Sequence, residues 1–207
     1  ISAEAVDSKG FSSRYFLYEF DLPKDISCAK KSTYASGFVY NSKTKEPLGA
    51  DIQIVNLTQN QQEGMHHSDN QTGEYLTVLN EHTSYGLFVS KTGFLYKSHT
   101  FDFTNMDTFD PVLLDIYLDP IEAGSVITLE NIFFKTGAFK LDHASFAELD
   151  KLVDFLNQNM QLKVEISGHT DNIGKKIDNI TLSTKRAESV VDYLIEAGIA
   201  KERISYK

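Results

Sequence analysis

LKVEIS at Leu162–Ser167, followed without a break by GHTDNIG at Gly168–Gly174, is the stretch that decides the fold of the C-terminal region. In the first part apolar and polar residues alternate, with Val164 and Ile166 on one face, which predicts a β-strand. The second part combines glycines with short polar side chains, which predicts a loop at the carboxyl end of that strand. Open α/β sheets usually place ligands at this position. We expect Gly168 there because glycine permits a close backbone approach and unusual dihedral angles.

Amphipathic helices are predicted on both sides of this strand and loop. Asp142 is expected to cap the first helix and Ser183 the second, and Gly198 is a plausible C-terminal stop. Apolar residues at spacings of three and four form one stripe on each helix: Phe146, Leu149, Leu152, Val153 and Leu156 on the first, and Ala187, Val190, Val191, Leu194 and Ile195 on the second. With strand-like segments at Val126–Phe134 and Ile204–Lys207, the order strand, helix, strand, helix, strand predicts an α/β domain over residues 121–207.

Residues 33–120 have a different pattern, in which short apolar-alternating runs are separated by Gly, Asn and Pro. The runs are 35–40, 51–57, 74–79, 84–90, 94–103 and 112–118. Runs of this length between turn signals predict an all-β sandwich. Residues 1–32 give a weaker signal, a strand at Tyr15–Phe20 that ends before Pro23, and we interpret them as an N-terminal segment from the end of an upstream domain.

Composition and charge exclude several classes of protein. The 207 residues are 41% hydrophobic and 24% charged, which is ordinary for a globular chain. A net charge of −9 without a basic stripe argues against nucleic-acid binding. Cys28 is the only cysteine, so it forms no internal disulfide, and no apolar segment precedes it as a lipoprotein signal would require. No apolar run approaches 18 residues, and the start without Met suggests a fragment of a longer protein.

The predicted loop and the second predicted helix each contribute one charged side chain, of opposite sign, to the same edge of the domain. Asp171 lies in the loop, and Arg186 is expected in the first turn of the helix. Such a pair suits a zwitterion, because a carboxylate binds a free ammonium and a guanidinium binds a free carboxylate through two hydrogen bonds. Asp171 and Arg186 could equally pair with each other, and spacing alone leaves these alternatives open.

Residues from about Ile127 to Lys207 resemble the OmpA-like C-terminal domain family of outer-membrane proteins, peptidoglycan-associated lipoproteins and flagellar stator proteins. The matching residues are 132–134 (IFF) with 136–137 (TG), 149–152 (LDKL), 164–166 (VEI), 168–172 (GHTDN), Asn179, 182–183 (LS), 186–187 (RA) and Val190. The resemblance implies a βαβαβ fold that binds the meso-diaminopimelate of the peptidoglycan stem peptide. It assigns the amine to Asp171 and the carboxylate to Arg186. Supporting contacts are implied for Thr170, Asn172 and Asn179, and rim positions for Thr136 and Gly137.

Two features depart from the family pattern. Lys135 stands where family members usually have Asp, and a neutral surface change is the favoured interpretation over an altered charge at the pocket. The family also continues beyond the position of Lys207 into a Gly-rich turn, a further strand and a helix. We therefore expect the domain to be incomplete at its C-terminal end, with some peptidoglycan contacts missing.

The sandwich region resembles the carboxypeptidase-regulatory-like, transthyretin-like domain. The matching residues are 36–40 (SGFVY), 44–48 (TKEPL), 50–52 (ADI), 72–75 (TGEY) and 92–94 (TGF). This resemblance implies a structural or spacer role without catalysis. The combination of the two domains resembles Bacteroidetes-type OmpA family outer-membrane lipoproteins.

The expected function is therefore non-covalent binding of peptidoglycan that tethers the outer membrane or an envelope complex to the cell wall. The expected location is the periplasmic face of the outer membrane of a Gram-negative bacterium, with other envelope proteins as further partners and a membrane anchor outside this sequence. No cofactor, metal or catalytic residue is expected, because His169 and the pair His66–His67 lack further ligands or a nucleophile at suitable spacing. The alternative is a scaffold subunit of a secretion or motility machine in which the same domain serves assembly.

Overall fold

The computed structural model describes residues 2–6, 12–16, 31–104, 110–168 and 176–207, in two compact units, 1–30 and 31–207. In the first unit β1 (Ser2–Val6) and β2 (Ser12–Phe16) form an antiparallel hairpin. The strand predicted at Tyr15–Phe20 overlaps β2, whereas its remainder, Pro23 and Cys28 lie outside the described residues. The boundaries predicted for the domains remain predictions.

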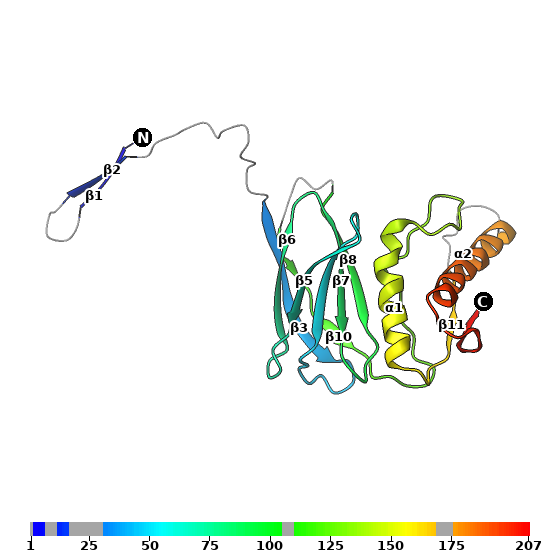
Figure 1. The fold of residues 1–207 in the computed structure, drawn as a ribbon. Helices are drawn as coiled ribbons and strands as arrows, with labels where there is room; N and C mark the ends of the chain where they lie inside the picture. The colour runs from blue at the N-terminus through cyan, green and yellow to red at the C-terminus, as the bar shows by residue number, and fades with distance from the viewer. Residues whose placement is uncertain (1, 7–11, 17–30, 105–109, 169–175) are drawn as a thin grey trace. The chain divides into compact units, whose positions relative to one another are not determined.

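Two sheets form the β-rich part of the second unit (Figure 1). One sheet has the order β10-β3-β6, with β9 also paired to β3, and consists of β3 (Ser32–Asn41), β6 (Glu74–Asn80), β9 (Val112–Leu113) and β10 (Ile116–Leu118). The other has the order β5-β4-β7-β8 and consists of β4 (Asp51–Asn56), β5 (Gln61–His67), β7 (Ser84–Ser90) and β8 (Lys97–Asp102). Both sheets contribute to one buried core, so the predicted β-rich region is confirmed.

Strand burial explains how the second sheet takes part in two cores. On β6 burial alternates, with Tyr75, Thr77 and Leu79 turned inward, as expected for a strand with one covered face. On β7 every residue from Tyr85 to Val89 is buried, so both of its faces are covered. One face lies in the sandwich core, and the other, through Phe88, joins a second core formed with the helices. The second sheet therefore lies between the first sheet and the C-terminal helices.

Strand β5 is the element of the sandwich that the sequence did not predict. Its residues QQEGMHH show no apolar alternation and are mostly exposed. Backbone pairing with β4 at the edge of the sheet is what holds them in a strand. His66 and His67, for which the sequence predicted no strand, therefore belong to one, because backbone pairing outweighs a polar composition at this edge.

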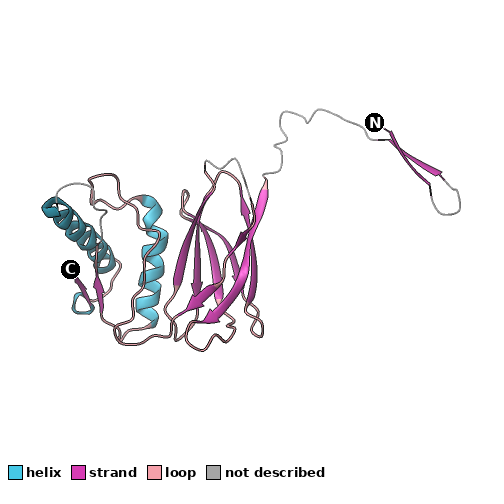
Figure 2. Ribbon diagram, turned by 180° about the vertical axis from the view of Figure 1, so that it is seen from behind, coloured by secondary structure: helices cyan, strands magenta, loops and turns pink. Residues whose placement is uncertain are grey.

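The C-terminal part is an α/β domain, as predicted. Its elements are the short 3₁₀ helix η1 (His143–Ser145), α1 (Phe146–Gln158), β11 (Val164–Ile166), α2 (Lys176–Glu196), the 3₁₀ helix η2 (Lys201–Arg203) and β12 (Ile204–Tyr206). β11 and β12 pair in parallel and, with α1 and α2, can be followed in Figure 2. Among the described residues no helix has the length and apolarity needed to cross a membrane.

The helix end predicted at Gly198 is confirmed, whereas Asp142 caps the short helix η1 that leads into α1 and not α1 itself. The Asp142 carboxylate accepts a hydrogen bond from the amide of Ala144 at 3.2 Å, which caps η1 at the entry to α1. Gly198 has a φ of 95°, and its amide donates to the carbonyl of Ile195 while the amide of Ile199 donates to Leu194. These two bonds form a Schellman motif, which ends a helix at a left-handed glycine.

Two other predictions for this domain are wrong. The segment Val126–Phe134 forms no strand in the described structure beyond an isolated bridge between Phe134 and Leu141. Its polar groups bond instead to α1 and η1, since the amide of Asn131 donates to Glu148 and the amide of Phe133 to Ser145. Ser183 does not cap α2 but lies inside it, where its hydroxyl bonds back to the carbonyl of Ile180.

A buried carboxylate joins α1 to the sandwich. Glu148 is fully buried, and its two oxygens accept hydrogen bonds from the hydroxyls of Tyr96 (3.1 Å) and Ser98 (3.0 Å) and from the backbone and side-chain amides of Asn131 (3.3 and 2.8 Å). Burial raises the pKa of Glu148, and these hydrogen bonds oppose the rise. A buried charge of this kind is tolerated because donors surround it.

We predict that Glu148→Ala destabilises the protein by about 2–4 kcal/mol, because it leaves buried donors without an acceptor. Glu148→Gln should cost less, because the amide keeps one acceptor oxygen and the two hydroxyls can accept from its nitrogen. Urea denaturation of the wild type and both variants measures the difference. Equal loss in the two variants would contradict a role for the hydrogen bonds.

The direction of the Glu148 pKa predicts a pH dependence. A carboxyl group whose folded pKa lies above its ordinary value of 4.5 binds protons more readily in the folded state. The stability of the wild type relative to Glu148→Gln should therefore fall as pH rises from 4.5 to the folded pKa, and should be constant above it. Thermal unfolding of both proteins across this range tests the sign; a difference that stays flat or grows with pH contradicts it.

Candidate functional site

The candidate site is built on one face of helix α2. Asn179, Ser183 and Arg186 follow one another at spacings of four and three residues, which aligns them along a single face. Asn179 is half-buried and has an interaction partner. Arg186 lies ten residues after the first residue of α2, Lys176, so the expectation that it falls in the first turn is wrong. The helix begins earlier than expected, and Arg186 therefore belongs to its middle.

Arg186 is held by the loop that precedes η1. Its Nε donates a hydrogen bond to the carbonyl of Ala138 at 3.0 Å, and its guanidinium carbon lies 4.8 Å from the centre of the Phe134 ring. Among the described residues no carboxylate forms an ion pair with it. The ring contact and the Nε bond fix the plane of the guanidinium.

The same loop brings Thr136 and Gly137 to Arg186. The amide of Ala138 donates to the carbonyl of Lys135 at 2.9 Å, which closes a tight turn with Thr136 and Gly137 at its exposed tip. Gly137 has a φ of 68°, a left-handed conformation that this turn position requires in a type II turn. Thr136, Gly137 and Arg186 are thus three of the predicted residues that the structure places together.

Further contacts fasten this loop at both ends. On the α2 side, the Ser189 hydroxyl donates to the carbonyl of Phe139 at 2.8 Å, and the Lys185 ammonium lies 5.2 Å from the centre of the Phe139 ring. On the α1 side, the Ser145 hydroxyl accepts from the amide of Phe133 at 2.8 Å and donates to its carbonyl at 3.2 Å. The turn is therefore positioned by both helices.

Gly168 joins the end of β11 to the same face of α2. A Cβ built on Gly168 would lie 2.2 Å from the carbonyl oxygen of Ser183, so the two backbones touch. This confirms the close approach expected of Gly168, although its φ is outside the left-handed range. Ser183 lies one turn before Arg186. The described chain therefore reaches the face of α2 at Gly168, directly before the residues predicted to form the polar loop.

The remaining predicted residues of the loop, Thr170, Asp171 and Asn172, lie outside the described residues, as does His169. Sequence reasoning missed Phe134, Ala138 and Ser189, which hold Arg186 and the turn. Phe134 was part of the motif that suggested the family, but no pattern indicated the role of a backbone carbonyl. In the described ranges no group of three acidic, His or Cys side chains could hold a metal ion.

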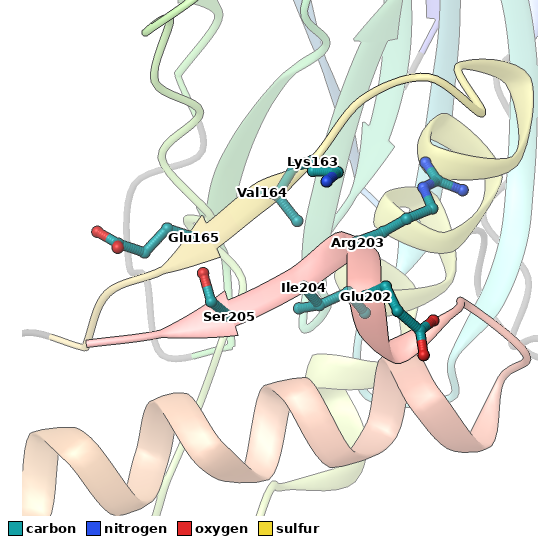
Figure 3. Close-up of a pocket in the computed structure, with 7 residues that line it drawn as sticks. All are labelled: Lys163, Val164, Glu165, Glu202, Arg203, Ile204 and Ser205. Atoms are coloured by element: carbon teal, nitrogen blue, oxygen red, sulfur yellow. The ribbon is translucent and has the colours of Figure 1, made fainter.

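A separate hollow of about 240 Å³ lies over the paired strands β11 and β12 (Figure 3). It is lined by Lys163, Val164, Glu165, Glu202, Arg203, Ile204 and Ser205, and contains none of the predicted site residues. Arg203 is committed to structure, because its guanidinium donates to the carbonyls of Leu162, Leu156 and Asn159 at 2.9–3.0 Å. We assign no ligand to this hollow.

The fold and this geometry define the class of the C-terminal part: an α/β domain with an arginine held on the helix that follows β11. The family of this C-terminal region follows from its similarity to a known family. Residues 133–207 match the OmpA family and form an OmpA family domain.

Relatives of known name are similar over this domain. Outer membrane protein P5 of Haemophilus influenzae is 35% identical over 75 residues, which cover 36% of this chain and 21% of that protein. Peptidoglycan-binding protein ArfA of Mycobacterium tuberculosis is 35% identical over 81 residues, 39% of this chain and 25% of that protein. The peptidoglycan-associated lipoprotein of Mesorhizobium japonicum is 29% identical over 75 residues, 36% and 45% respectively. The match thus spans less than half the length of each relative.

We predict that Gly168→Ala destabilises the protein by roughly 1–3 kcal/mol, because the new methyl group collides with the Ser183 carbonyl and separates β11 from α2. Gly64→Ala is the matched control, since the closest atom to its Cβ would be the end of the flexible His66 side chain at 3.0 Å, and Ile54 would lie at an ordinary contact distance of 3.8 Å. Denaturation midpoints of both variants provide the measurement. An unaffected Gly168→Ala protein would show that the contact can relax.

Proposed function

We propose that the OmpA family domain of this chain binds peptidoglycan non-covalently through the diaminopimelate of its stem peptide. The names of two relatives, a peptidoglycan-binding protein and a peptidoglycan-associated lipoprotein, support the polymer as ligand. The observation that carries the proposal is the guanidinium of Arg186, which the Ala138 carbonyl and the Phe134 ring hold beside the exposed turn of Thr136 and Gly137.

The proposed mechanism divides the zwitterionic centre of diaminopimelate between two side chains. Arg186 binds the free carboxylate through its terminal nitrogens, and Asp171 binds the free amine. The distances allow this division: Gly168 packs one turn from Arg186, and the three residues from Gly168 to Asp171 span at most about 10 Å. Thr170, Asn172 and Asn179 supply supporting hydrogen bonds, while Thr136 and Gly137 border the ligand.

This assignment makes the chain a binding protein and not an enzyme. By the same proposal it works in the envelope of a Gram-negative bacterium, where binding to the wall tethers the outer membrane or an envelope complex. The names of the outer membrane protein and the lipoprotein among the relatives support this location. We interpret the sandwich as a carboxypeptidase-regulatory-like structural unit, on the sequence motifs and on its two sheets around one core.

We predict that Arg186→Ala and Asp171→Ala each weaken binding to diaminopimelate-type peptidoglycan about 10- to 100-fold, because each removes a charge-assisted contact worth roughly 1.5–3 kcal/mol. Pull-down with purified wall and a titration with soluble stem peptide give the two measurements. Lys163→Ala and Glu165→Ala, exposed residues of the β11–β12 hollow, are the matched controls and should bind like the wild type. Thermal unfolding verifies that all four variants remain folded.

The ligand itself supplies the second control. Wall with lysine in place of diaminopimelate lacks the side-chain carboxylate that Arg186 would bind, so the wild type should bind it much more weakly. Equal affinity for both walls would contradict the zwitterion mechanism. Undiminished binding by both Arg186→Ala and Asp171→Ala would contradict the site, and a scaffold role in an envelope machine would then be the better explanation.

A further inference from the structure

The segments around Arg186 are rich in positive charge, although the chain as a whole is acidic. The chain as a whole has 29 acidic and 20 basic residues. Yet the segments 133–141 (FFKTGAFKL) and 179–187 (NITLSTKRA) contain no acidic residue and hold Lys135, Lys140, Lys185 and Arg186. One segment contains the turn of the candidate site and the other the face of α2 on which that turn is held.

These two segments are in direct contact. The bond from Arg186 to Ala138 and the bond from Ser189 to Phe139 join the turn to the helix. The Lys185 ammonium lies over the Phe139 ring, which is 48% exposed. Lys185 and Arg186 therefore lie against the segment that also holds Lys135 and Lys140, although almost 50 residues separate the two segments in the sequence.

Two acidic side chains that flank these segments, Asp142 and Glu188, are engaged in other hydrogen bonds. Asp142 caps η1 by accepting from the amide of Ala144. Glu188 accepts a hydrogen bond from the hydroxyl of Tyr206 at 3.2 Å. Lys135 and Lys140 are exposed, and neither forms an ion pair with a described residue. We name Lys135, Lys140 and Lys185 the cationic border of the site.

We infer that the cationic border selects stem peptides that carry a second free carboxylate next to the diaminopimelate. This inference rests on the proposed function, in which Arg186 already binds the carboxylate of the zwitterion. Three further cations add attraction for negative charge and none for a neutral amide. The stem peptide offers one such group next to diaminopimelate, the α-carboxyl of the γ-linked glutamate. This group is negative when free and neutral when amidated. The border thus makes the site discriminate between these two forms of the wall.

The experiment compares two soluble diaminopimelate-containing stem peptides that differ only in this glutamate group, free carboxylate or amide. The full chain should bind the free form about tenfold more tightly, a factor in the range expected for several exposed charge interactions. The variant K135Q/K140Q/K185Q should lose this preference and bind both peptides with the affinity of the wild type for the amidated form. Raising the salt concentration should reduce the preference of the wild type, because exposed charges are screened.

The control variant K31Q/K43Q/K45Q removes the same number of charges from exposed positions of the sandwich. It should keep the full preference, which separates the border from a general effect of net charge. Equal affinity of the wild type for the two peptides, or a preference that persists in K135Q/K140Q/K185Q, overturns the inference and leaves the proposed function intact. Failure of the wild type to bind either peptide overturns both.

Discussion

Helix α1 is buried on two sides, and the arrangement of residues 31–207 depends on this constraint. Towards the sandwich, Tyr96 and Phe155 make an edge-to-face contact with ring centres 5.7 Å apart, and Glu148 accepts hydrogen bonds from Tyr96 and Ser98. In the same core, residues of α1 and α2 pack together with residues of the second sheet. Because α1 packs against the sandwich and against α2, the sandwich and the OmpA family domain share a core instead of being joined only by a linker.

This constraint extends to the candidate site through a short series of contacts. α1 begins at η1, whose Ser145 hydroxyl holds Phe133 by two hydrogen bonds. The turn of Thr136 and Gly137 follows immediately and ends on α2, where Arg186 and Ser189 bind the carbonyls of Ala138 and Phe139. A guanidinium fixed in this way loses little further freedom when a carboxylate binds, which favours affinity. The site is therefore positioned by packing at a distance as well as by its own residues.

Local signals in the sequence were sufficient for most elements. Alternation predicted the strands around Ile52 and Tyr75, apolar stripes predicted both helices, and Asp142 and Gly198 marked helix ends through side-chain and backbone chemistry that acts within a few residues. These local signals failed for segments whose conformation is stabilised by hydrogen bonds to another element. β5 is polar and forms a strand only because it pairs with β4. Val126–Phe134 is apolar enough for a strand, but its polar groups bond to α1 and η1.

The sequence by itself determined the chemistry of this protein: the class of the C-terminal domain, the polar residues at 168–172 (GHTDN) and the arginine that follows them. Those properties lie in residue types at fixed spacing, which a sequence contains in full. Only the tertiary structure decided that Arg186 lies on the Phe134 ring and bonds to Ala138, and that Lys185 lies over the Phe139 ring. Contacts between residues almost 50 positions apart depend on how the helices pack. A backbone carbonyl is present in every residue, so the residue types in a sequence do not show which carbonyl accepts a hydrogen bond.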